Sequence, residues 1–379
     1  MRGAFRIARF FEIPVRLHWS FFLLLGYVAY TSRQQGDSWT DTGLSFLFVL
    51  SIFCCVVLHE FGHALMARRY GVDTKDIILS PIGGIARLYR FPEKPGQELM
   101  VAIAGPLVNV AIASVLGSLS WWTSPRELHQ LFLLFTGGDL PPGAEASSFL
   151  PYFIPALFLL NIALALFNLL PAFPMDGGRV LRALLALRFS RLKATRIASR
   201  IGQVMALLLA GFGVMEGNIV TVLIGGFVFF MAYQEYRHAR MEHLLRSGKV
   251  EDIMQPSCTK VLLSDRIEQV WERAQQSPEK DFLVFQEDGV WVGVLEGARL
   301  ENAAKDPVLQ KSSVIDFYKP VWVGLTPQDN LKTVYDRMYH TGAPVLPVFS
   351  GVELVGTVPM ETLQGVLKTR PLIRGLIQS

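Results

Sequence analysis

Residues 43–66 read GLSFLFVLSIFCCVVLHEFGHALM, an apolar run that is interrupted near its end by His59, Glu60 and His63. The run is long enough to cross a bilayer as a helix, because about 20 residues span ~30 Å of hydrocarbon. Ionisable side chains in such a segment are costly and usually mark a functional site that faces the protein interior. The stretch therefore predicts both a membrane-spanning helix and a site on it.

The composition of the whole chain also favours a membrane protein. Of its 379 residues, 51% are hydrophobic and only 18% are charged, and the mean hydropathy is +0.34. The expected fold class is an α-helical polytopic membrane protein with a smaller α/β domain at its C-terminal end. Six transmembrane helices are expected, near residues 17–34, 43–66, 99–121, 150–170, 200–216 and 218–236, in a transmembrane domain over residues 1–240.

The positions of lysine and arginine predict the orientation of these helices, because positive residues stay on the cytoplasmic side. Arginines precede the first expected span, follow the second at Arg68 and Arg69, and gather after the fourth and the sixth. Both termini are thus expected in the cytoplasm, in a multi-pass protein of the cell (inner) membrane. Because the arginines cluster beside apolar runs and form no basic stripe, no nucleic-acid partner is expected.

Residues 77–88 interrupt the helical pattern. Two short apolar runs flank Pro81 and the Gly83–Gly84 pair. Short apolar runs around a turn of this composition are typical of paired strands. We therefore expect a hairpin near the membrane surface.

The last 130 residues contain an internal repeat of about 60 residues. The first copy is predicted to contain strands at 261–263, 282–285 and 291–294 and a helix at 267–275; the second, strands at 322–325, 345–349 and 355–357 and a helix at 330–339. The copies are assigned to residues 248–310 and 311–370. A unit of this size usually needs its twin to complete a core.

His59 and His63 are one helical turn apart, so their side chains share a face and can bind one metal ion, with Glu60 beside them. This is the H-E-x-x-H pattern of zinc hydrolases. A catalytic zinc site takes three protein ligands and leaves a position for water. The best candidate for the third ligand is Asp176, which is expected at a depth similar to that of His63. The alternative role for Asp176 is to cap the helix that follows it.

The sequence on both sides of Asp176 supports its role as a ligand. Pro171 and Pro174 break the preceding helix, and Gly177 and Gly178 permit an unusual turn. Asp176 is therefore expected to reach back toward the two histidines.

Three motifs together resemble a known family. VLHEFGHA (57–64), AGPLVN (104–109) and NLLPAFPMDGGR (168–179) look like those of the site-2 protease family of intramembrane zinc metalloproteases. The likeness covers residues 1–236, and the six-span layout is similar to the prokaryotic subgroup. The C-terminal repeat resembles a tandem pair of cystathionine-β-synthase-type (CBS) domains, a combination known in that subgroup.

The resemblance implies one Zn²⁺ per subunit held by His59, His63 and Asp176, with Glu60 as the general base of peptide hydrolysis. Zinc lowers the pKa of bound water to about 7, so that Glu60 can take its proton. Asn168 matches a family asparagine expected to hold the substrate strand or the developing oxyanion; its alternative role is a hydrogen bond between helices.

Four further residues are expected to have structural roles. Asn109 and Asn161 are expected to pack helices, and Gly105 to permit their close approach. His18, which borders the first expected span, is read as an interfacial histidine, with a gating role at the site as the alternative.

The expected substrate is a transmembrane protein in the lipid bilayer, such as an anti-sigma factor or a membrane-tethered pro-sigma factor. A helix hides its peptide carbonyls in its own hydrogen bonds, so the substrate must unwind. The 77–88 hairpin could then offer an edge strand for it to pair with. The competing hypothesis is a CBS-regulated metal or ion transporter in which the same three ligands form a transport site.

CBS pairs are expected to bind an adenine nucleotide in the cleft between the repeats, through a Thr or Ser followed three residues later by an Asp. This chain departs from that pattern: Thr357 is followed by Glu361, one place late, and the first repeat has neither group at the matching places. Homodimerisation, or contact with the cytoplasmic part of the substrate, are the alternative roles of the pair.

Overall fold

The structure, a computed structural model, describes residues 3–81, 83–88, 92, 94–135, 150–256 and 258–373. The chain divides into two compact units, Met1–Tyr236 and Arg237–Ser379, and the division falls inside helix α8 (Ile219–Ser247). Unit 1 contains the candidate ligands, and unit 2 contains the internal repeat.

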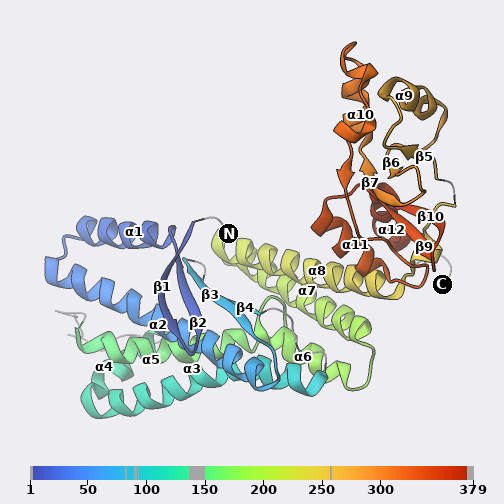
Figure 1. Ribbon diagram of the computed structural model, residues 1–379. Coiled ribbons are helices and arrows are strands. Elements are labelled where there is room, and N and C mark those ends of the chain that lie inside the picture. Colours follow the sequence, from blue (N-terminus) through green and yellow to red (C-terminus); the bar gives the residue numbers. More distant parts are fainter. Residues whose placement is uncertain are drawn as a thin grey trace. The chain divides into compact units, whose positions relative to one another are not determined.

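Five of the described helices are long and apolar enough to cross a membrane. They are α2 (Trp39–Arg69), α3 (Pro95–Thr123), α5 (Phe153–Asn168) with the short helix η1 (Leu150–Tyr152) before it, α7 (Arg191–Met215) and α8 (Figure 1). These helices correspond to the last five of the six expected spans.

The first expected span, residues 17–34, does not meet this criterion. Its beginning belongs to strand β2 (Ile13–His18), and helix α1 (Phe21–Gln34) has only 14 residues. At about 1.5 Å per residue α1 is ~21 Å long, shorter than the ~30 Å hydrocarbon core. Ile13 and Val15 are buried and alternate with exposed or half-buried neighbours, as in a strand with one buried face. The sequence before α1 therefore continues as strand β2 and does not lengthen the helix.

A four-stranded sheet accompanies α2. Its order is β1 (Ala4–Phe10), β2, β3 (Thr74–Ser80) and β4 (Gly83–Leu88); β2 and β3 are parallel, and the outer pairs are antiparallel. The β3–β4 pair confirms the expected hairpin, although its turn residue 82 lies outside the described residues. The sequence analysis missed β1 and β2, because their arginines were interpreted only as a topology signal.

The sheet packs on α2 through one apolar face (Figure 1), in which β2 and β3 bury side chains against Phe61 and Ala64. Ion pairs hold the strands together: Arg87 of β4 donates from Nε to Asp76 of β3 (2.6 Å), and Arg16 of β2 lies 3.1 Å from the same carboxylate. The hydrogen bond from Arg87, opposed by burial, keeps the pKa of Asp76 below its usual value. Strand β4 is therefore a fixed edge.

Helix α3 lies between α2 and α5 and approaches both closely at glycines. A Cβ on Gly62 of α2 would lie 2.7 Å from the carbonyl oxygen of Ala104, and one on Gly117 of α3 would lie 2.7 Å from the Phe158 ring. Helix α4 (Pro125–Phe135) follows α3; residues 136–149 lie outside the described residues.

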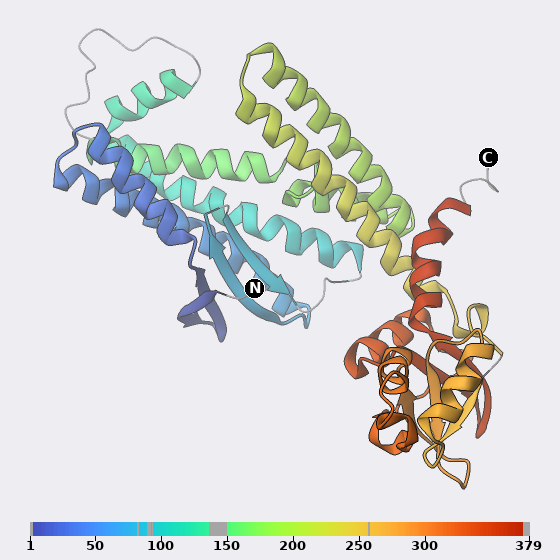
Figure 2. The same cartoon turned by 90° about the horizontal axis from the view of Figure 1, so that it is seen from above.

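Helix α6 (Asp176–Ala186) joins this group to the α7–α8 pair, whose helices run side by side (Figure 2). Its Arg182 is 5% exposed and lies 2.6 Å from both Glu98 of α3 and Glu235 of α8. A buried arginine without these carboxylates would be strongly destabilising. The two ion pairs thus fix the helix that begins with Asp176.

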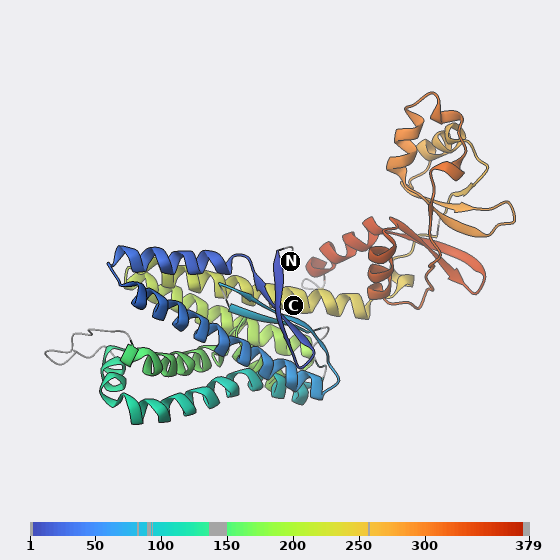
Figure 3. The ribbon, with the colours of Figure 1, turned by 60° about the vertical axis from the view of Figure 1, so that its left-hand side comes forward.

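Unit 2 is an α/β domain with two sheets (Figure 3). The first sheet has the order β5 (Lys260–Leu262), β6 (Phe282–Phe285), β7 (Trp291–Leu295) and β8 (Lys319–Pro320), with helices α9 (Ile267–Gln276) and α10 (Gly297–Ala304). The second pairs β9 (Val345–Ser350) with β10 (Glu353–Pro359), next to α11 (Leu331–Thr341) and α12 (Met360–Ile373). The expected strand at 322–325 is reduced to a single bridge between Leu325 and Val348.

The two halves of unit 2 exchange short segments. Val250 and Ile253, near the start of the first repeat, are buried in the core formed mainly by the second. In return, Val314 is buried in the core of the first repeat, and β8 extends the first sheet. Each half therefore depends on residues of the other, as expected for twin repeats.

Candidate metal centre

Three buried donor atoms converge where α2 meets the start of α6. Nε2 of His59 and Nε2 of His63 are 3.1 Å apart, and Oδ2 of Asp176 lies 3.2 Å and 3.0 Å from them. The three residues are 6–7% exposed. A tetrahedral ion bound at 2.0–2.1 Å would separate its ligands by about 3.3 Å, so the donors fit zinc in number, type and spacing.

Local sequence explains how Asp176 reaches the histidines. After α5 ends at Asn168, the chain turns and begins α6 at Asp176 itself. A Cβ on Gly177 would overlap the carbonyl oxygens of Leu169 and Leu170, and one on Gly178 would lie 2.7 Å from the backbone of the same loop. The two glycines therefore let α6 start directly against the loop. They do so by lacking a side chain; the expected unusual turn is not formed by them, since both lie within α6 and neither has a positive φ.

A positive charge lies near the carboxyl group of Asp176. Arg179 Nη1 is 3.9 Å from Oδ1 of Asp176. An opposite charge nearby favours the ionised carboxylate, which is the form that can bind a metal.

The second nitrogen of His63 faces a backbone oxygen. Nδ1 of His63 lies 2.7 Å from the carbonyl oxygen of Val101 on α3. A carbonyl can only accept, so Nδ1 carries the proton and Nε2 presents its lone pair to the other ligands. Nδ1 of His59 lies 2.6 Å from Oδ1 of Asn109.

Gly105 on α3 forms the floor beside the ligand nitrogens. A Cβ at this position would overlap Nε2 of His63 and would lie 2.8 Å from Nε2 of His59. The sequence analysis gave Gly105 a role in helix packing; the structure shows that its missing side chain leaves room for the donors themselves.

Glu60 lies beside this cluster and is half-buried. Its Oε2 accepts a hydrogen bond of 2.8 Å from the backbone N–H of Ala86 in β4. Gly84 permits this approach, because a Cβ there would lie 3.0 Å from Cγ of Glu60. The edge strand and the carboxylate are therefore in direct contact.

No hydrogen bond joins the other two candidates to His59, His63 or Asp176 in the described part of the chain. Asn168 is the half-buried last residue of α5, and its side chain forms no hydrogen bond with the part of the chain that the structure describes. His18 ends β2, where its ring bonds the Ser20 hydroxyl at 2.7 Å; among the described residues the ligand cluster contains only His59, His63 and Asp176.

Sequence comparison supports the same chemistry. Residues 47–209 match the family described as peptidase family M50. Zinc metalloprotease MJ0392 of Methanocaldococcus jannaschii is 37% identical over 257 residues, 68% of each chain. Putative zinc metalloprotease sll0528 of Synechocystis sp. is 31% identical over 311 residues, 78% of this chain and 76% of the relative. Rip3 of Mycobacterium tuberculosis, also named a putative zinc metalloprotease, is 27% identical over 94% of this chain and 91% of its own.

Solved structures show weaker likeness. A site-2 protease from Methanocaldococcus jannaschii is 36% identical and covers 62% of this chain and 95% of its own, with a TM-score of 0.41. The CBS-domain protein ATU1752 from Agrobacterium tumefaciens is 15% identical over 32% of this chain and 93% of its own, with a TM-score of 0.29. Because both scores are low, the assignment rests on the sequence relatives.

The helices and the donor cluster define a multi-pass membrane protein with a zinc centre, and the relatives define its activity as proteolysis. The chain belongs to peptidase family M50, the site-2 proteases, and is a zinc metalloprotease. These findings favour the protease over the alternative of a transporter.

Gly105→Ala should remove most of the bound zinc, because the added methyl group would overlap a ligand nitrogen. Metal content is measured by mass spectrometry on purified protein. Gly211→Ala, whose Cβ would meet nothing within 4 Å, is the matched control. A folded Gly105→Ala protein with a full complement of zinc would contradict this role.

Proposed function

We propose that this zinc metalloprotease cuts a membrane-anchored regulator, such as an anti-sigma factor or a tethered pro-sigma factor, within the membrane and near its cytoplasmic end. The observation that carries the proposal is the position of the buried donor cluster: His59 and His63 are part of α2, a helix long and apolar enough to span a bilayer. A site at that depth meets peptide bonds that are also in the membrane.

His59, His63 and Asp176 are the proposed zinc ligands, and Glu60 is the proposed general base. The bound ion supplies Lewis acidity, polarising the scissile carbonyl and making water more acidic. Oε2 of Glu60 is occupied by the Ala86 N–H, so Oε1 is the oxygen available to accept a proton from water. The hydrogen bond fixes the carboxylate in the orientation that this transfer needs.

Asn168 is proposed to hold the substrate strand or the developing oxyanion. It ends α5 immediately before the loop that carries Asp176, and its amide is not used within the described structure. An amide N–H donor is suited to either role.

The substrate is proposed to unwind and pair with β4. This strand is the edge of the sheet. The Ala86 N–H donates to Glu60 and so points away from β3, and because alternate residues share a direction, the polar backbone groups of Gly84 also face the open side. A substrate strand added there would lie directly beside Glu60.

Both termini of the transmembrane region are proposed to lie on the cytoplasmic side. Strands β1 and β2 precede the α1–α2 hairpin and β3 and β4 follow it, yet all four form one sheet. The chain therefore returns to the side from which it started, whether or not α1 crosses the whole bilayer. Four further spanning helices, α3, α5, α7 and α8, bring it to that side again, and the arginines near these ends favour the cytoplasm.

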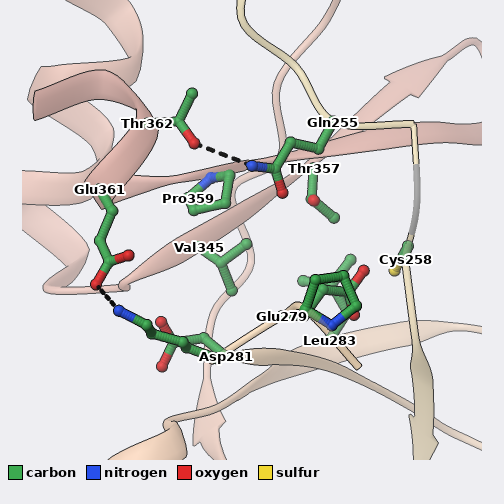
Figure 4. Close-up of a pocket in the computed structure, with 12 residues that line it drawn as sticks. Gln255, Cys258, Glu279, Asp281, Leu283, Val345, Thr357, Pro359, Glu361 and Thr362 are labelled. Carbon is green, nitrogen blue, oxygen red and sulfur yellow. Dashed lines mark hydrogen bonds and ion pairs between the residues drawn. The ribbon is translucent and has the colours of Figure 1, made fainter. Parts of the chain in front are cut away.

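Unit 2 is proposed to be a CBS pair, with repeats near residues 248–310 and 311–370, that holds no nucleotide in its central cavity. This cavity has a volume of about 80 Å³ and is lined by Glu279, Asp281 and Glu361 (Figure 4). Its one lysine, Lys280, already pairs with Glu361 at 2.7 Å. Three carboxylates against one paired ammonium group repel phosphate groups. Homodimerisation through unit 2, or contact with the cytoplasmic part of the substrate, remains the proposed role.

Glu60→Gln should lower the rate of cleavage by about 10²–10⁴-fold, because the amide cannot accept the proton from water. Zinc should stay bound, since the three ligands are unchanged. Cleavage of a reconstituted membrane-anchored substrate and metal content are measured together. Glu216→Gln, at an exposed helix end, is the matched control. Unchanged cleavage by Glu60→Gln would remove Glu60 from the mechanism.

Ala86→Pro should slow cleavage without releasing zinc, because it removes the N–H that faces Glu60 and the substrate edge while the ligands stay in place. Proline is tolerated on an edge strand when its nitrogen faces outward. Ala86→Ser keeps the N–H and should cleave normally. Equal cleavage by the two variants would argue against pairing at β4.

Titration of the full-length protein in detergent with ATP, ADP and AMP should give no saturable heat. Saturable binding at micromolar concentrations would show that the acidic cavity accepts phosphates after all. Repeating the titration with Thr357→Val, which alters the cavity wall, would then tell whether the nucleotide occupies this cavity.

A further inference from the structure

Two buried asparagine side chains form a series of hydrogen bonds that begins at His59. Asn109 of α3 is 1% exposed and Asn161 of α5 is fully buried. Nδ1 of His59 lies 2.6 Å from Oδ1 of Asn109, Nδ2 of Asn109 donates to Oδ1 of Asn161 at 3.2 Å, and Nδ2 of Asn161 donates to the carbonyl oxygen of Leu157 at 2.8 Å. These hydrogen bonds therefore link three helices, α2, α3 and α5.

The carbonyl of Leu157 determines the direction of every hydrogen bond in this series. A carbonyl oxygen can only accept, so the group of Asn161 that faces it must be the NH₂. The oxygen of Asn161 then faces Asn109 and accepts from its NH₂. The oxygen of Asn109 is left to face His59, whose Nδ1 must carry the proton. Nε2 of His59 consequently has its lone pair free and faces His63 and Asp176.

The two histidines are thus oriented by different means. His63 is oriented by the Val101 backbone, which no substitution removes, whereas His59 depends on two side chains. Asn109 is also one turn beyond Gly105 on α3. A single helix face therefore makes room for Nε2 of the ligands at Gly105 and holds Nδ1 of His59 at Asn109.

We infer that Asn109 and Asn161 are positioning residues for the metal centre: they fix the tautomer and the ring orientation of His59, so that its Nε2 is always presented to zinc. The inference rests on the proposed role of His59 as a ligand. It adds to the expectation that the two asparagines pack helices, which their hydrogen bond between α3 and α5 confirms.

A packing role and a positioning role predict that two variants of Asn109 rank in opposite order of zinc affinity. Leucine has a similar volume and no acceptor, so packing would tolerate it while His59 would lose its partner. Aspartate keeps an acceptor for Nδ1 but places a carboxylate among apolar helices, which packing alone would tolerate less well. Partners of this kind typically change metal affinity 10–100-fold.

The test measures zinc affinity by competition with a chelator and records the visible spectrum of the Co²⁺-substituted protein, neither of which requires a substrate. Asn109→Leu should bind zinc about 10–100-fold more weakly and show altered Co²⁺ bands. Asn109→Asp keeps the acceptor for Nδ1 of His59 but loses the donor to Asn161, so it should bind zinc more tightly than Asn109→Leu. Asn161→Leu should have an intermediate effect, because it frees the Asn109 amide to rotate and offer a donor to His59. Asn302→Leu, on the exposed side of α10, is the matched control.

The double variant Asn109→Leu with Asn161→Leu addresses folding, because it leaves neither amide unpaired. It should melt like the unchanged protein without metal but retain the weak zinc affinity of Asn109→Leu. Normal affinity in either leucine variant of Asn109, or weaker binding by Asn109→Asp than by Asn109→Leu, would overturn the inference. If all variants bind zinc normally while substitution of His59 also leaves binding unchanged, the ligand assignment itself fails.

Discussion

The meeting of His59, His63 and Asp176 inside a group of apolar helices is the constraint on which unit 1 depends. Polar atoms in such an interior are costly unless each has a partner. The donor atoms face one another, and the outward nitrogens of the two imidazoles face Val101 and Asn109. The packing of α2, α3 and the start of α6 thus gives each of the four imidazole nitrogens a polar partner.

Glycines allow the helices to approach this cluster. Gly62 brings α2 against α3, Gly105 leaves space for the ligand nitrogens, and Gly177 lets α6 begin against its own loop. A methyl group at any of these places would meet backbone or ligand atoms. Close approach by small residues is a common way of packing helices in membranes, and here it also sets the size of the metal site.

The contact between Glu60 and Ala86 connects the chemistry to the sheet. A carboxylate that reaches the backbone of an edge strand couples the proposed general base to the surface at which an extended peptide is proposed to bind. The pairs of Asp76 with Arg87 and Arg16 keep this edge in place relative to the other strands. The sheet is therefore part of the proposed active site and not merely a cover for α2.

The sequence by itself determined the types of the candidate metal donors, the spacing of the two histidines along α2 and the apolar length of five helices, because these depend on local periodicity. It also determined the β3–β4 hairpin from its turn residues. Only the tertiary structure decided that residues 13–18 form a strand, that Asn109 and Asn161 form a relay to His59, and that Glu60 bonds β4. These features join residues between 26 and 62 positions apart, and such partners are selected by burial and hydrogen bonding across the fold, which no local pattern records.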